Sequence, residues 1–82
     1  MQETIELARN VDTVIVVGGH ESGNTRRLAE AVKAEGKKVL HIETPEQLDP
    51  KFLSQSKRIG LTAGASTPKF LIDATQEALH SL

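Results

Sequence analysis

Short apolar runs and amphipathic segments alternate along the first half of the chain. Thr13–Val17 reads TVIVV and is followed by two glycines, a pattern typical of a strand that is buried on both faces. A helix is predicted over residues 25–35, with Asn24 as its N-cap and Gly36 as its C′ residue. Its apolar positions fall at helical spacing and can face a sheet: Leu28, Ala31 and Val32. A second strand is predicted at residues 39–42.

The second half of the chain predicts two short helical turns, a third strand and a final helix. Residues 44–47 have the form of a capping box with proline at N1, and residues 49–50 start another short helix. The third strand is predicted at residues 58–62. Thr67 is the predicted N-cap of the last helix, which runs through Pro68 at N1 to about residue 79. Its predicted buried stripe consists of Phe70, Leu71, Ala74 and Ala78.

This order of elements predicts an α/β fold. Strands that alternate with helices form a parallel sheet with helices on both faces, here a small three-layer α/β/α sandwich. The expected strand order is 2-1-3, and residues 1–82 are taken as a single domain. Residues 3–10 are interpreted as the end of a further helix, as though the chain had been cut from a longer protein.

Topology alone predicts the position of a binding site. In such sheets a ligand binds at the carboxyl ends of the strands, where the chain leaves neighbouring strands in opposite directions. Two loops meet there, residues 18–25 and 63–67, and each leads into a helix whose first N–H groups favour an anion. Polar candidates for contact are Ser22, Asn24, Thr25, Ser66 and Thr67, supported by Gly18, Gly19, Gly23 and Gly64. The alternative is that these residues only turn the chain and cap helices.

Composition narrows the range of partners. Ten basic and eleven acidic residues give a net charge of −1, so neither nucleic acid nor a membrane surface is an expected partner. The chain has no cysteine, which excludes thiolate metal sites and cysteine-ligated clusters. No catalytic carboxylate pair and no metal site are predicted, and the expected location is the cytoplasm. Of the acidic residues only Glu21 is expected in the candidate site, and His20 is interpreted as a solvated loop histidine.

Three blocks of sequence resemble the C-terminal third of the LytB/IspH family, the 4-hydroxy-3-methylbut-2-enyl diphosphate reductases. The blocks are VVGGHESGNTRRLAE, HIETPEQLDPKFL and RIGLTAGASTP, and the similarity runs from about residue 11 to residue 79. The resemblance implies one lobe of a three-lobed oxidoreductase of isoprenoid biosynthesis, in the methylerythritol phosphate pathway. In that family a [4Fe-4S] cluster is held by cysteines that lie upstream of this segment, so the chain alone is expected to be inactive.

The same resemblance implies roles for individual residues. Ser22, Asn24 and Ser66 match family positions that bind the substrate diphosphate, whereas Gly23 stands where the family often has a serine. The implied partners are a diphosphate-containing small molecule and the missing lobes of the parent enzyme. Other hypotheses remain open: a stand-alone or engineered fragment with weak phosphate binding or no activity, and a flavodoxin-like module that binds FMN. The sequence has neither the tryptophan nor the tyrosine that usually stacks on a flavin.

Overall fold

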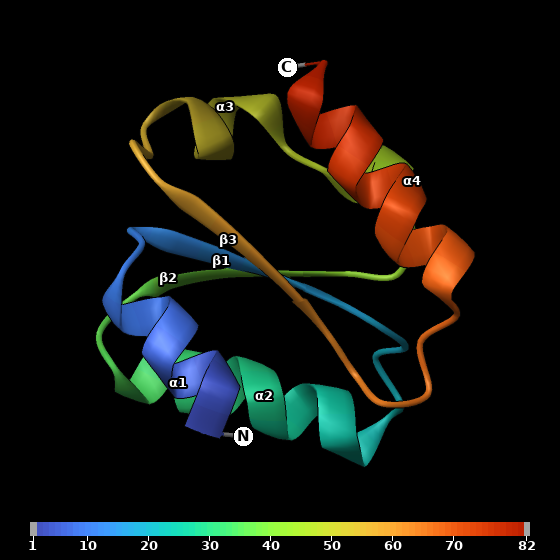
Figure 1. The fold of residues 1–82 in the computed structure, drawn as a ribbon, viewed down its shortest axis with the longest axis horizontal. Coiled ribbons are helices and arrows are strands. Elements are labelled where there is room, and N and C mark those ends of the chain that lie inside the picture. Colours follow the sequence, from blue (N-terminus) through green and yellow to red (C-terminus); the bar gives the residue numbers. More distant parts are fainter. Residues whose placement is uncertain (1, 82) are drawn as a thin grey trace.

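A three-stranded parallel sheet forms the centre of the computed structural model, which describes residues 2–81. Its strands are β1 (Thr13–Val17), β2 (Lys38–Ile42) and β3 (Ile59–Ala63), in the order β2-β1-β3 (Figure 1). Val17, the last residue of β1, lies opposite Ile42 on one side and Ala63 on the other. All three strands therefore end at the same edge of the sheet, and the predicted order is confirmed.

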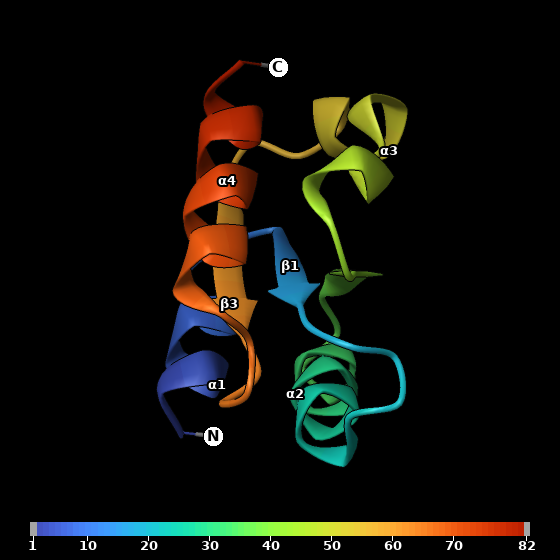
Figure 2. The same ribbon diagram turned by 90° about the vertical axis from the view of Figure 1, so that its right-hand side faces the viewer.

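Helices cover both faces of the sheet. The helices α1 (Gln2–Arg9) and α2 (Gly23–Ala34) lie on one face (Figures 1 and 2). The short turns η1 (Pro45–Gln47) and α3 (Pro50–Ser54) and the helix α4 (Lys69–His80) lie on the other. This is the predicted three-layer α/β/α sandwich, and the helix expected before the first strand is confirmed as α1.

Strand β1 divides the core because its alternate side chains point to opposite faces. Val14 and Val16 pack on the α1 and α2 side, where the other buried residues are Ala8, Leu28 and Val32. Ile15 and Val17 pack on the other side with Ile42 and Leu53, and residues of β3 and α4 surround them. All five residues of β1 are buried, as its uninterrupted apolar run predicts.

The start of α4 differs from the prediction. Pro68, not Thr67, is the N-cap, because the Thr67 hydroxyl donates to the Val17 carbonyl at 2.9 Å instead of capping the helix. Phe70 was predicted to be buried and this is wrong, since the residue is 69% exposed. Leu71 packs against the core as predicted, and it is joined by the fully buried Thr75, whose hydroxyl donates to the Leu71 carbonyl. The stripe passes to one side of Phe70.

The predicted capping box at residues 44–47 is also wrong in detail. Thr44 makes no side-chain capping hydrogen bond, and the segment forms a 3₁₀ turn. The Gln47 side chain reaches back past it and accepts from the backbone N–H of Glu43 at 2.6 Å. In the next turn, Asp49 caps as expected and accepts from the N–H groups of Lys51 and Phe52.

Asp12 gives a testable link between the fold and pH. Its carboxylate accepts from the backbone N–H groups of Lys57 and Arg58 at 3.0 and 3.3 Å, and these bonds, that of Lys57 first, hold its pKa below the usual 3.8. A lowered pKa contributes stability above the unfolded value, and that stability is lost as pH falls through the folded value. Asp12→Asn should therefore destabilise the protein near neutrality and remove part of the acid dependence.

The measurement is urea unfolding of both proteins at about pH 6 and about pH 3. The gap between wild type and Asp12→Asn should shrink at the lower pH. Asp73→Asn, which changes an exposed aspartate on α4, is the control for the charge change alone. An Asp12→Asn gap that stays constant with pH would show that the carboxylate charge contributes nothing at this corner.

Candidate functional site

Two loops meet at the carboxyl edge of the sheet, where the topology predicts a site. One follows β1 and leads into α2; the other follows β3 and leads into α4 (Figure 1). Backbone bonds hold their first residues against neighbouring strands: Gly64 N–H donates to the Val17 carbonyl at 3.1 Å, and Gly18 N–H donates to the Ile42 carbonyl at 2.9 Å. The starts of α2 and α4, both twelve-residue helices, therefore border the same edge.

The first loop ends in a helix cap two residues earlier than predicted. Ser22 is the N-cap of α2, and its hydroxyl accepts from the N–H of Thr25 at 3.3 Å. Asn24, the predicted N-cap, already lies inside the helix. Its side-chain oxygen instead accepts from the N–H of Ala65 in the second loop at 3.0 Å. Asn24 thus ties the two loops together and leaves its NH₂ group to donate elsewhere.

Thr25 lies behind the two loops rather than at their surface. Its side chain is fully buried, and within the described chain its hydroxyl oxygen has no hydrogen-bond partner. A Cβ built on Gly18 would lie 2.5 Å from that oxygen, and one built on Gly64 would overlap it. The two glycines are therefore required so that Thr25 can fill the space between the loops.

The second loop presents Ser66 to solvent. Ser66 is exposed and borders a hollow of about 220 Å³ together with Gly18, Gly19, Glu43, Thr67, Pro68 and Leu71. Ser22 is half-buried, and Gly23 and Asn24 are exposed at the adjoining start of α2. The predicted site residues thus gather at one edge of the sheet, with Ser66 in the hollow and the other two candidates beside it.

The prediction that Glu21 is the only acidic residue in the site is wrong, because Glu43 lines the hollow. The Glu43 carboxylate accepts from the backbone N–H of His20 at 3.2 Å and lies 3.3 Å from the ring nitrogen Nδ1 of that histidine. The other ring nitrogen of His20 contacts the His41 carbonyl at 3.2 Å. His20 is half-exposed but held at three points. The signal for Glu43 was its position directly after β2, at the same sheet edge.

Comparison with known proteins identifies the family that has this fold. The family model described as "LytB protein" matches residues 1–80. The chain belongs to the LytB family. The resemblance seen in the three sequence blocks is thereby confirmed, and it extends over α1 as well as the two loops.

Over the part that they share with this chain, curated LytB relatives are identical at about half of the positions. The 4-hydroxy-3-methylbut-2-enyl diphosphate reductase of Nitratidesulfovibrio vulgaris (strain DSM 19637 / Miyazaki F) is 54% identical over 81 residues, which are 99% of this chain and 29% of that protein. The reductase of Geotalea uraniireducens (strain Rf4) is 44% identical over the same shares. The chain therefore spans less than a third of the length of these reductases and matches one part of them.

Solved structures of such reductases contain the same fold. One, of the (E)-4-hydroxy-3-methyl-but-2-enyl diphosphate reductase described as the terminal enzyme of the non-mevalonate pathway, superposes with a TM-score of 0.92 at 40% identity. This chain covers 29% of it, and 99% of this chain is matched. The Plasmodium falciparum enzyme gives a TM-score of 0.85 at 27% identity, with 24% of that protein covered. The α/β sandwich is thus one domain of the LytB architecture.

The residues of this LytB domain do not fit an iron–sulfur cluster. The chain supplies no thiolate, the ligand that such clusters require. Within residues 2–81 no group of three or more histidine, aspartate or glutamate side chains can hold a metal ion either. In the same part of the chain, no helix has the length and apolar character needed to cross a bilayer.

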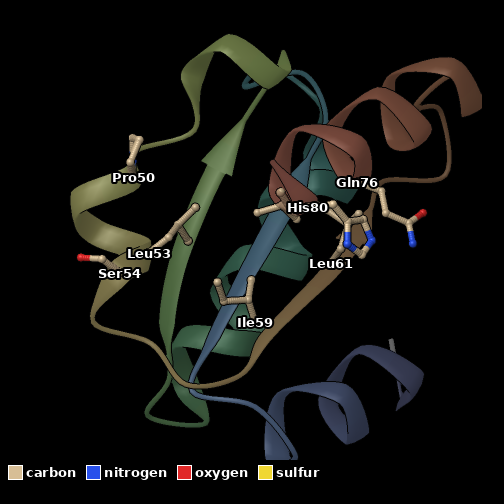
Figure 3. Close-up of a pocket in the computed structure, with 8 residues that line it drawn as sticks. Pro50, Leu53, Ser54, Ile59, Leu61, Gln76 and His80 are labelled. Atoms are coloured by element: carbon tan, nitrogen blue, oxygen red, sulfur yellow. The ribbon is translucent and has the colours of Figure 1, made fainter. Parts of the chain in front are cut away.

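A larger hollow lies away from the two loops. It lies between α3, β3 and the end of α4 (Figure 3). Its volume is about 740 Å³. Its lining is mainly apolar and includes Leu53, Ile59, Leu61 and Leu79. Of its polar groups, Gln76 and His80 lie on α4, whereas Ser54 lies on α3 at the other side of the view in Figure 3. Volume alone would favour this hollow, but convergent donors favour the sheet edge.

Proposed function

We propose that this chain forms the substrate diphosphate-binding domain of a LytB-type 4-hydroxy-3-methylbut-2-enyl diphosphate reductase. The observation that carries the proposal is the pair of helix-start loops joined by the bond from Ala65 N–H to Asn24. Helix N-termini present N–H groups and a positive dipole end, which suit phosphate oxygens. The substrate class, a diphosphate ester, follows from the names of the related reductases.

Each of the three proposed binding residues has a hydrogen-bond donor available. Ser66 is exposed on the rim of the hollow and can turn its hydroxyl toward an anion. The Asn24 NH₂ group is available because Ala65 engages the oxygen of the same amide. Ser22 uses its oxygen to cap α2 and retains its hydroxyl proton as a donor. Gly18, Gly19, Gly23, Gly64 and Thr67 support these groups as backbone.

The same arrangement limits what the domain does by itself. The three proposed side chains are neutral, and the nearest charged side chain in the hollow is the carboxylate of Glu43. Binding of a diphosphate to the domain alone should therefore be weak. The reduction itself requires electrons from a cluster, which in this proposal belongs to the part of the reductase that this chain does not cover.

Titration with inorganic pyrophosphate tests the proposal. In amide NMR spectra, saturable shifts should be confined to residues 18–24 and 65–69. Ser66→Ala should weaken binding about tenfold, since a hydrogen bond to a charged group contributes about 1.5–3 kcal/mol. Amides that stay unmoved at millimolar pyrophosphate would contradict the proposal.

Ser54→Ala is the matched control for the loss of a serine hydroxyl. Ser54 is also exposed, but it lies in α3 and lines the distant apolar hollow (Figure 3). This variant should bind pyrophosphate like the wild type. Equal weakening by both substitutions would assign the effect to general loss of structure rather than to the loop.

A further inference from the structure

The backbone nitrogen and both ring nitrogens of His20 each lie close to an oxygen atom of the protein. Its backbone N–H donates to Glu43 Oε2, its ring Nδ1 lies 3.3 Å from Glu43 Oε1, and its ring Nε2 contacts the His41 carbonyl. Both ring nitrogens thus face oxygen atoms that only accept. The Glu43 carboxylate therefore contacts both the backbone N–H and the ring of His20.

Neighbouring contacts fix the position of this pair. The His41 ring stacks edge-on against His20, with centroids 4.3 Å apart, and its Nε2 contacts the Gly18 carbonyl at 3.0 Å. From the other side, Gln47 holds the backbone N–H of Glu43. The carboxylate consequently lies against the first loop, where a Cβ built on Gly19 would be 3.7 Å from Glu43 Oε2.

Glu43 therefore sits where an anion would be received. It lines the same hollow as Ser66, and it accepts from the N–H of His20, a backbone donor of the first loop. The contact is reversible in principle, since the His20 and Glu43 side chains are 51% and 46% exposed and solvent can replace either partner.

From these contacts we infer that Glu43 is an internal competitor for the anion site, a latch that a diphosphate displaces from His20. The inference rests on the proposed function of the loops and adds a regulation of that site. Release of the latch frees the His20 N–H and its ring for the incoming phosphate. It also removes a negative charge from the hollow, so the latch lowers affinity for anions and favours ligands with enough charge to displace it.

Glu43→Gln is the decisive variant. Glutamine keeps an oxygen that can accept from the His20 N–H but carries no charge, so the loop should stay folded. Pyrophosphate should bind about five- to tenfold tighter. The variant removes the Glu43 charge, which would otherwise repel the multiply charged ligand from a few ångströms away in water. Glu46→Gln is the control, because that glutamate is exposed in the same segment but does not line the hollow; its effect should be less than about twofold.

The outcomes separate this inference from the proposed function. If the wild type binds pyrophosphate and Glu43→Gln binds it equally or more weakly, the latch is overturned and the proposed function stands. No binding to either protein would overturn both. Binding to Glu43→Gln alone, or tighter binding to it, would support both.

A measurement on the wild type avoids dependence on the variant. The side-chain carboxyl carbon of Glu43 should shift during the pyrophosphate titration with the same midpoint as the His20 amide. A Glu43 carboxyl that does not respond while the Ser66 amide saturates would overturn the latch even if Glu43→Gln failed to fold.

Discussion

Gly64→Ala should lower the free energy of unfolding by about 2–3 kcal/mol, a large share of what a domain of this size has. The added Cβ would overlap the Thr25 hydroxyl oxygen and crowd its Cβ. Thr25 is fully buried and cannot rotate out into solvent. The two loops would have to separate, and the strain would also reach the bond between Asn24 and Ala65.

The overlap with Thr25 makes a specific rescue possible. Thr25→Ala removes the hydroxyl oxygen that the new Cβ would overlap. The double variant should recover more than half of the lost stability, which corresponds to a coupling energy of about 1–3 kcal/mol between the two positions. Urea unfolding of the two single variants and the double variant gives this energy directly.

Gly23→Ala is the matched control for a glycine in the same pair of loops. A Cβ on Gly23 meets nothing within 4 Å, and the residue is the first of α2. The substitution should be neutral or stabilise slightly, by about 0.5 kcal/mol, because alanine loses less backbone freedom on folding. A Gly64→Ala protein as stable as Gly23→Ala would show that the loops are not packed around Thr25.

The layers and strand order followed from the sequence because they depend on strong local patterns. The buried run at Thr13–Val17 fixes the central strand, and helical spacing on either side fixes the crossovers. Phe70 is a residue whose burial such patterns did not predict correctly. Its apolar character suggested burial, but which stripe of α4 faces the sheet depends on the direction in which the helix leaves β3. Leu71 faces the core as predicted, and Thr75, which was not predicted, is the fully buried residue of α4.

In the site, too, the position could be predicted from the sequence but the individual contacts could not. Topology brought the two loops to one edge, and the residue types there indicated an anion. The partners of each hydrogen bond were not predictable, because they depend on how the loops close on each other. Ser22 rather than Asn24 caps α2, and Asn24 crosses to Ala65. Glu43, which is far from both loops in sequence, enters the hollow only because β2 ends beside β1.

Asn24→Asp should separate the structural role of residue 24 from its proposed role in binding. A carboxylate can still accept from the Ala65 N–H, and a negative charge in the first turn of α2 is favourable by about 0.3–1 kcal/mol. Stability should therefore be kept or slightly raised. Pyrophosphate affinity should fall at least tenfold, because the NH₂ donor is replaced by a charge that repels the ligand.

Two further variants complete the comparison. Asn24→Ala removes the bond to Ala65 as well, so it should lose about 1 kcal/mol of stability together with binding. Asn10→Asp introduces the same charge after α1, near the start of β1 and away from the loops, and should leave binding within about twofold of the wild type.

The informative pair of measurements on Asn24→Asp is the urea midpoint and the pyrophosphate midpoint on the same sample. A stable protein that no longer binds places the amide of Asn24 at the anion, because repair of the loop contact does not repair binding. A stable protein that binds as tightly as the wild type would confine Asn24 to joining the loops. Ser22, Ser66 and the backbone N–H groups would then have to account for all of the affinity.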